Sequence, residues 1–348
     1  MPDQDINQDI NQDINQDTDN RDHRTDHGSR GTGKAGPDRR TTVAVITRDR
    51  PESALRTLDR LAALPERPPV VVVDNGSDDA VTAALRGHPV GAEVLSPPGN
   101  TGALGRNLAV RHASTPYVAF SDDDSWWRPG ALSRAADLLD THPRLGLLAA
   151  RSLVGPEEAE DPLNALLADS PLPTAADLPG RSVLGFLGCA CVVRRRAYLD
   201  AGGYHPLLFF GAEETLLAYD LAAAGWGVAY EPSVVAHHHP DPGGRPGRSV
   251  RLRRNALLTA WLRRPVNVAL RHTGRLAASA VSGEAGAMTA LREALVRAPE
   301  ALRRRRRLPP RVERDVRLLE QRAARARPHA AGATGAHPTA RPQREGRR

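Results

Sequence analysis

Apolar, β-rich runs alternate with helix-like segments through the middle of this 348-residue chain. Residues 42–47 and 69–74 are almost continuously apolar, which is typical of parallel strands buried on both faces. Between them, residues 52–64 place leucines along one side of a helix. Residues 117–120 form a further apolar run. Because strands that alternate with helices form mainly parallel sheets with helices on both faces, the sequence predicts an α/β fold.

The second half of the chain is less regular. Residues 155–180 are rich in proline and acidic residues, and we expect a loop region there. Residues 183–194 are apolar enough to predict one buried strand. Residues 227–235 predict another strand, which runs into three consecutive histidines.

Composition divides the chain into four parts. Residues 1–40 contain Gln-Asp-Ile-Asn repeats and little apolar surface, so we expect a disordered acidic leader. Residues 41–243 carry the predicted sheet, residues 244–327 form a basic helical extension, and residues 328–348 form a disordered tail. From Arg245 onward there are about 26 arginines and about 7 acids, so the net charge of +7 reflects a basic tail.

Two features bear on the compartment. No apolar run reaches the roughly 18 residues of a membrane span, and the polar N-terminus lacks the apolar region of a secretory signal. Cys189 and Cys191 lie two residues apart, too close for an ordinary disulfide, and we expect both to be small buried residues. Together these features predict a cytoplasmic protein.

Three adjacent aspartates, Asp122, Asp123 and Asp124, follow the apolar run that begins at Tyr117. Like charges repel, so a chain tolerates them where a cation or hydrogen-bond donors lie opposite. Hard divalent cations such as Mg²⁺ or Mn²⁺ take oxygen ligands, and Mg²⁺ combines one or two carboxylates with substrate phosphate oxygens. The alternative is an acidic turn that caps the next helix. If the strand continues, Asp122 and Asp124 share one face and Asp123 lies on the other.

Four short motifs then occur in a characteristic order. They are Thr47-Arg-Asp-Arg-Pro51, Val73-Asp-Asn-Gly-Ser-Asp78, Gly105-Arg-Asn107 with Ser121-Asp-Asp-Asp124, and Gly211-Ala-Glu-Glu214. Each is weak alone, but the ordered set, within residues 41–240, resembles the inverting family-two glycosyltransferases. The resemblance implies a GT-A-like fold. It also implies transfer of a sugar from a nucleotide-diphosphate donor to an acceptor hydroxyl, with inversion and usually with Mg²⁺ or Mn²⁺.

The resemblance implies roles for individual residues. Asp124 is expected to bind the metal, and the residues expected to contact the donor are Thr47, Arg48, Asp74, Asn75, Arg106, Asp122 and Asp123. Asp74 also follows a buried strand, where open α/β sheets bind ligands, although turn formation is its alternative role. Arg106 lies in the first turn of its helix, where anions are favoured. A plain surface arginine is an equal alternative for Arg50.

Glu213 and Glu214 begin a predicted helix, where the helix dipole favours acids whatever their function. The family's matching pair normally reads Glu-Asp, with the second acid as the base that takes the acceptor proton. The resemblance therefore implies that Glu214 is the catalytic base, with Glu213 as the alternative because Glu replaces Asp. Among the histidines, alternation aims His238 at the expected metal face, and a solvated loop is its alternative role.

The basic extension has two equal interpretations. Residues 248–271 and the run Arg303 to Arg307 could bind an anionic membrane surface, at its inner face, or a partner. They could instead form a helical lid on the catalytic domain. The acceptor, whether a glycan, a lipid-linked molecule or a small molecule, is not specified by the sequence.

Two other functions compete with sugar transfer. A nucleotidyltransferase on a similar sheet would not need Glu214 and would release pyrophosphate. A basic nucleic-acid-binding protein is disfavoured, because the arginines lie outside the predicted core and Trp261 is the one aromatic residue among them.

Overall fold

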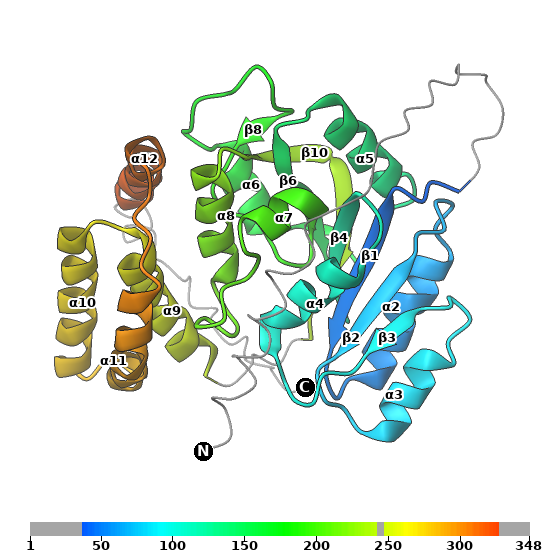
Figure 1. Cartoon of the computed structure of the whole chain (residues 1–348), viewed down its shortest axis with the longest axis horizontal. Helices are drawn as coiled ribbons and strands as arrows, with labels where there is room; N and C mark the ends of the chain where they lie inside the picture. Colours follow the sequence, from blue (N-terminus) through cyan, green and yellow to red (C-terminus); the bar gives the residue numbers. More distant parts are fainter. Residues whose placement is uncertain (1–36, 242–246, 327–348) are drawn as a thin grey trace, which may run out of the picture.

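A computed structural model describes residues 37–241 and 247–326 of the chain. Figure 1 shows a sheet with helices packed on both faces and the helices α9 to α12 grouped beside it. Residues 1–36 of the predicted leader and all of the predicted tail lie outside the described residues, so these two assignments stay predictions.

The sheet has ten strands in the order β3-β2-β1-β4-β9-β6-β10-β5, with β7 paired to β6 and β8 to β10, within the described residues. The strands are β1 (Thr41–Thr47), β2 (Val70–Asp74), β3 (Glu93–Leu95), β4 (Tyr117–Asp122), β5 (Ser125–Trp127), β6 (Leu145–Val154), β7 (Ala159–Glu160), β8 (Arg181–Ser182), β9 (Cys191–Arg194) and β10 (Gly227–His238). The predicted α/β class, with a mostly parallel sheet, is confirmed.

The helices that flank the sheet are α2 (Pro51–Ala62), α3 (Asp79–Arg86), α4 (Gly105–His112), α5 (Ala131–Thr141), α6 (Pro162–Ala168), α7 (Arg195–Asp200) and α8 (Glu213–Ala223). The helices after β10 are α9 (Arg248–Arg263), α10 (Val266–Val281), α11 (Ala287–Arg303) and α12 (Pro310–Ala326). A short 3-10 turn, Gly102–Leu104, precedes α4. None of the helices in the described ranges combines the length and apolar character that a membrane crossing requires.

The pairing of the strands brings their polar ends together. β1 runs parallel to β2 and to β4, so Thr47 lies beside Asp74 and Ile46 beside Asp122. On the other side of the sheet, β10 pairs with β5 in antiparallel fashion and places His238 opposite Ser125. The histidines and the aspartates, more than a hundred residues apart in sequence, therefore meet at one edge.

Apolar side chains cover both faces of the sheet, as buried parallel strands require. One core cluster gathers Leu58 of α2 and Leu139 of α5 against the sheet. The other gathers Phe120 of β4 with Tyr198 and Tyr204 on the side of α4, α7 and α8. Cys189 and Cys191 are buried free thiols, as expected, and burial raises the pKa of both.

The expectations for residues 155–180 and 183–194 were wrong in part. The first stretch contains α6, which begins where the Asp161 side chain accepts a hydrogen bond from the Leu163 backbone N–H and where Pro162 occupies the first turn. In the second stretch only Cys191–Arg194 is a strand. The preceding residues form a buried loop that carries Gly188 to the interior of the site. Apolar composition alone does not distinguish such a loop from a strand.

The basic extension packs on the sheet domain through two apolar clusters. Leu257 and Leu262 of α9 pack with Leu216 of α8, and Val312 of α12 packs with Tyr219 of α8. The predicted helix at residues 248–271 is divided, because Pro265 separates α9 from α10. In the arginine run, Arg305 donates to the carbonyl oxygens of Trp261 and Arg264. These contacts favour the interpretation of a packed helical extension.

Candidate active site

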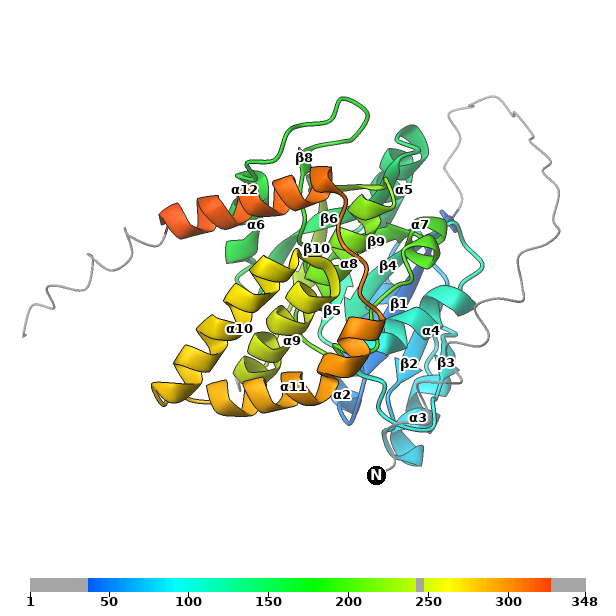
Figure 2. The same ribbon diagram turned by 60° about the vertical axis from the view of Figure 1, so that its left-hand side comes forward.

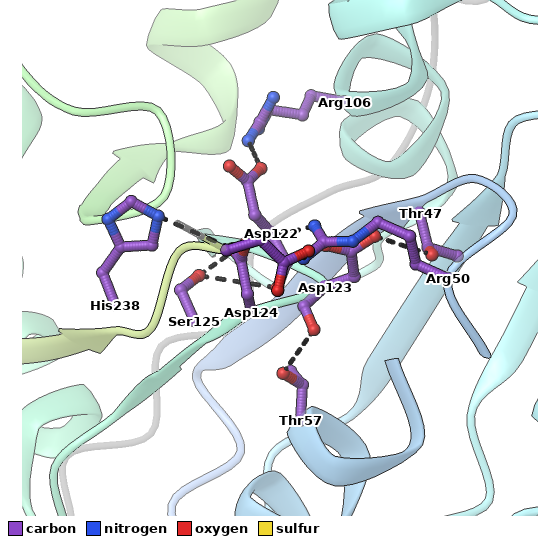
Figure 3. Close-up of polar contacts among 10 residues, drawn as sticks. Thr47, Arg50, Thr57, Arg106, Asp122, Asp123, Asp124, Ser125 and His238 are labelled. Atoms are coloured by element: carbon purple, nitrogen blue, oxygen red, sulfur yellow. Dashed lines mark hydrogen bonds and ion pairs between the residues drawn. The ribbon is translucent and has the colours of Figure 1, made fainter. Parts of the chain in front are cut away.

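The three aspartates point toward three different sets of partners (Figure 3). Asp122 accepts a hydrogen bond from Arg106. Asp123 accepts one from the Thr47 hydroxyl at 2.9 Å and another from Arg50. β4 ends at Asp122 and a turn follows, so the alternation expected for a continuing strand does not apply.

Asp124 lies between the side chains of an arginine and a histidine. Its Oδ2 accepts a hydrogen bond from Arg50 at 3.1 Å, and its Oδ1 lies 3.6 Å from His238 Nε2. The same Oδ1 is buried and has no hydrogen-bond partner among the described residues. Burial, and then the charge of Asp122, raise the pKa of Asp124. Burial likewise raises the pKa of Asp123 to about 7. Additional positive charge beside Asp123 and Asp124 would therefore stabilise their ionised carboxylates.

Other elements hold the acidic turn from three sides. Thr57 of α2 donates to the Asp123 carbonyl oxygen at 2.9 Å, and the Asp122 backbone N–H donates to the Ser125 hydroxyl at 2.7 Å. The backbone N–H of His239 donates to the Asp124 carbonyl oxygen at 2.8 Å. The positions of the carboxylates are therefore fixed by hydrogen bonds from α2, β5 and the end of β10.

Arg106 connects the aspartates to the glutamates. It is buried, pairs with Asp122, and places its guanidinium 5.6 Å from the ring centre of Phe120 and 5.9 Å from that of Tyr204. A Cβ atom at Gly188 would lie 3.0 Å from Glu214 Oε1 and 3.6 Å from Arg106 Nη2. The bare backbone of Gly188 therefore lies against both side chains.

Glu213 and Glu214 begin α8 after a strained loop. Phe209 and Ala212 have φ angles of 60° and 65°, which favour glycine. Asn255 of α9 stabilises this loop, because its Nδ2 donates to the carbonyl oxygens of Leu208, Phe210 and Gly211. Burial raises the pKa of both glutamates, and Glu214 further raises that of Glu213. A carboxyl with a raised pKa is suited to accept a proton near neutral pH.

A cleft of about 300 Å³ opens at the ends of β1 and β2. Five of the predicted donor residues line it, namely Thr47, Arg48, Asn75, Asp122 and Asp123. Phe209 forms another part of its wall, and Gly102 lies so close that a Cβ there would be 2.5 Å from the Phe209 carbonyl oxygen. This contact explains the glycine at position 102, whose φ is +58°.

Two predicted donor residues do not line the cleft. Asp74 is buried, accepts a hydrogen bond from the Ser77 backbone N–H at 3.1 Å, and accepts another from the Thr82 hydroxyl. These contacts are the ones expected if Asp74 stabilises a turn, which was its alternative role. Arg106 is turned inward to Asp122. The expected donor contacts of both residues stay predictions.

Three residues of the site have a weak signal in the sequence or none. Arg50, interpreted equally as a surface arginine, contacts Asp123, Asp124 and Asp241. Its place in the Thr47-Arg-Asp-Arg-Pro51 motif was the available signal. Tyr204 and Asn255 belong to no motif, because their roles depend on contacts between segments distant in sequence.

Comparison with protein families identifies the domain. Residues 42–202 match the family model described as glycosyl transferase family 2. The chain contains a family-two glycosyltransferase domain. The matched range contains the cleft-lining ends of β1 and β2 and the whole acidic turn. It ends before Glu213 and before His238.

A curated relative of this glycosyltransferase is the N-acetylglucosaminyl-diphospho-decaprenol L-rhamnosyltransferase of Mycobacterium tuberculosis. It is 29% identical over 227 residues, which are 55% of this chain and 73% of the relative. The proteins of strains CDC 1551 / Oshkosh and H37Rv match equally.

Solved structures show that this family-two enzyme has the GT-A fold. The mannosyltransferase PcManGT from Pyrobaculum calidifontis, solved with GDP-Man and Mn²⁺, matches with a TM-score of 0.53 and 23% identity, over 86% of this chain and 85% of that one. Residues 1–349 of S. aureus TarS, solved with UDP-GlcNAc, match with a TM-score of 0.52 and 18% identity, over 78% and 82% of the two chains.

Proposed function

We propose that residues 41–243 transfer a sugar, with inversion at the anomeric carbon, from a nucleotide-diphosphate donor to an acceptor hydroxyl. The observation that carries this proposal is the pairing of two kinds of acid around Arg106. Asp122 of the acidic turn forms an ion pair with Arg106, and Arg106 also interacts electrostatically with Glu213 and Glu214. We assign donor binding to the carboxylates of the acidic turn and proton acceptance to the glutamates.

Donor binding is assigned to the cleft at the ends of β1 and β2. Thr47, Arg48 and Asn75 offer hydroxyl, guanidinium and amide groups there. The structural neighbours were solved with GDP-Man and with UDP-GlcNAc, which supports a nucleotide-diphospho-sugar as the donor class. Asp122 and Asp123 line the same cleft and would accept hydrogen bonds from sugar or ribose hydroxyls.

A divalent cation fits beside Asp124. The unpartnered buried Oδ1 and the nearby His238 Nε2 offer two ligand atoms, although no group of three or more His, Cys, Asp or Glu side chains in the described ranges is arranged to hold a metal. Two protein ligands suffice where phosphate oxygens complete the shell, and an imidazole favours Mn²⁺ over Mg²⁺. When bound, the cation would stabilise negative charge on the departing diphosphate.

Glu214 is assigned as the base that accepts the proton of the acceptor hydroxyl, with Glu213 as the alternative. An inverting displacement needs one base, on the side of the sugar opposite the leaving group. The raised pKa of Glu214, caused first by burial, makes this carboxylate a stronger base than an exposed glutamate. Arg106, which lies over the Tyr204 ring, and the backbone of Gly188 are its neighbours.

The acceptor is proposed to be lipid-linked. The curated relative is by name a rhamnosyltransferase acting on a diphospho-decaprenol, which is the basis for this choice. Such an acceptor would place the enzyme, as a peripheral protein, at the cytoplasmic face of a membrane.

The test is a screen of nucleotide-diphospho-sugars for donor hydrolysis with Mg²⁺, Mn²⁺ or EDTA, followed by transfer to a lipid-linked acceptor. We expect Asp124→Ala to abolish transfer and to remove metal-dependent donor binding, measured by calorimetry, while the unfolding temperature stays close to that of the parent. Asp137→Ala is the matched control, because Asp137 is an exposed partner of Arg40 and does not line the cleft. Full activity in excess EDTA, or an active Asp124→Ala enzyme, would contradict the assignment.

A further inference from the structure

Helices α10 and α11 expose apolar side chains on the sides that face away from the core. Their inward sides are formed by residues such as Leu276 and Ala294, which are buried. Seven of the twelve exposed large apolar side chains in the described ranges lie on these two helices. They are Val266, Leu270, Val281, Met288, Leu295, Val296 and Leu302, with 43–87% of each residue exposed. A helix that is apolar on both sides normally has partners on both sides.

The exposed sides of α10 and α11 are also cationic. On α11, Arg292 precedes Leu295 and Val296 by three and four residues and so shares their side of the helix. On α10, Arg271 and Arg275 lie one turn apart, next to the side that carries Leu270. All three arginines are exposed, and none takes part in an ion pair found among the described residues. α10 contains no acidic residue.

The acids of α11 do not offset this charge. Glu293 pairs with Arg254 of α9, and Glu300 pairs with Arg303 and Arg304. We call the exposed side chains of α10 and α11 the α10–α11 face. Figure 2 turns this part of the molecule forward and shows α10 and α11 on its outer side.

The charge of the α10–α11 face indicates which kind of partner it binds. A second copy of the chain, in a two-fold dimer, would bring the same arginines against one another, which costs free energy. An anionic bilayer offers apolar depth for the leucines and valines and negative headgroups for the arginines. The face carries no aromatic side chain on which nucleic-acid bases would stack.

We propose that the α10–α11 face docks the enzyme on an anionic lipid bilayer. This placement differs from the one expected from the sequence, because Arg304 and Arg305 of the basic run make contacts within the protein. The α10–α11 face is also linked to the candidate active site through α9. α9 packs against α11 and carries Asn255, which holds the loop before Glu213. The inference adds a location to the proposed function, and lipid binding is measured without donor or acceptor.

The experiment is flotation of the full-length protein with vesicles of phosphatidylcholine alone or mixed with phosphatidylglycerol, at low and high salt. We expect flotation with the anionic vesicles, reduced by salt. The variant Arg271→Gln/Arg275→Gln/Arg292→Gln should lower the binding constant about a hundredfold, since each arginine near the surface contributes about tenfold or less. Leu270→Gln/Leu295→Gln/Val296→Gln should also lower it, with less effect of salt.

The control variant is Leu166→Gln/Arg196→Gln, which changes an exposed leucine of α6 and an exposed arginine of α7. It should float as the parent does. Unfolding temperatures and metal-dependent donor hydrolysis should be unchanged in all three variants, which separates loss of docking from loss of the site. Equal flotation of all variants, or equal flotation with neutral and anionic vesicles, would overturn the proposal. So would a parent dimer, seen by light scattering, that the face variants convert to monomer.

Discussion

The negative charges of the three aspartates and of the two glutamates in the site are compensated in different ways. Each of the three aspartates has an arginine within ion-pair distance: Arg106 for Asp122, and Arg50 for both Asp123 and Asp124. His238 also lies close to Asp124. Neither glutamate has an ion pair among the described residues, and Glu213 Oε2 is buried without a hydrogen-bond partner. Burial raises the pKa of acids in both groups, but cations oppose the effect more directly at the aspartates.

This difference separates two kinds of chemistry. Carboxylates that already have cationic partners are suited to exchange one cation for another, as binding of a metal and a diphosphate requires. A buried carboxylate without an ion pair is suited to take up a proton. Under the proposed function, the carboxyl group therefore serves two roles that differ because of what surrounds it.

Among the tests that separate the two groups, the largest effect is expected at the glutamates. Glu214→Gln keeps the shape of the side chain but cannot accept a proton, so turnover should fall by roughly 10²–10⁴-fold. Donor affinity, measured by calorimetry with the nucleotide-diphospho-sugar, should be unchanged. Glu213→Gln is the matched variant and should reduce turnover much less. The opposite order of the two effects would assign the base to Glu213.

The pH dependence should show a smaller effect. The base must be ionised, and burial raises the pKa of Glu214 above its ordinary value of 4.5. As pH falls, kcat/KM should therefore decline about tenfold per unit, beginning at a higher pH than an exposed glutamate would give. Glu214→Gln should remove this decline. A profile that stays flat down to pH 4.5 would contradict a buried base.

The smallest effect is expected from residues that hold the two groups in place. Asn255→Ala leaves carbonyl groups before Glu213 without a donor, and should cost about 1–3 kcal/mol of unfolding free energy. Thr57→Val removes one hydrogen bond to Asp123 and should cost about 1 kcal/mol. Chemical denaturation measures both. Two further results would show that the glutamates and the aspartates are held in place independently. Asn255→Ala would lower kcat without changing donor affinity, and Thr57→Val would lower donor affinity.

The first half of the fold was predicted well because its signals are local. The apolar residues of β1, the run of valines in β2 and the leucines of α2 are visible as periodic or continuous apolar patterns. The second half contains antiparallel insertions and a buried loop, and β9 joins β4 to β6 although it follows β6 in sequence. No local pattern specifies such pairings, because they are chosen by contacts between distant segments.

The sequence by itself determined the fold class, the family resemblance and five of the residues that line the cleft. These follow from short motifs, because the chemistry of a donor site needs given side chains at the ends of given strands. Only the tertiary structure decided the partners of each acid. The end of β4 at Asp122 directs Asp122 to Arg106 and Asp124 to His238, and Asn255 reaches the glutamates from a helix some forty residues later. The interaction between two charges depends on the distance between them in space. Packing of the folded chain sets that distance, and the order of residues in the sequence does not.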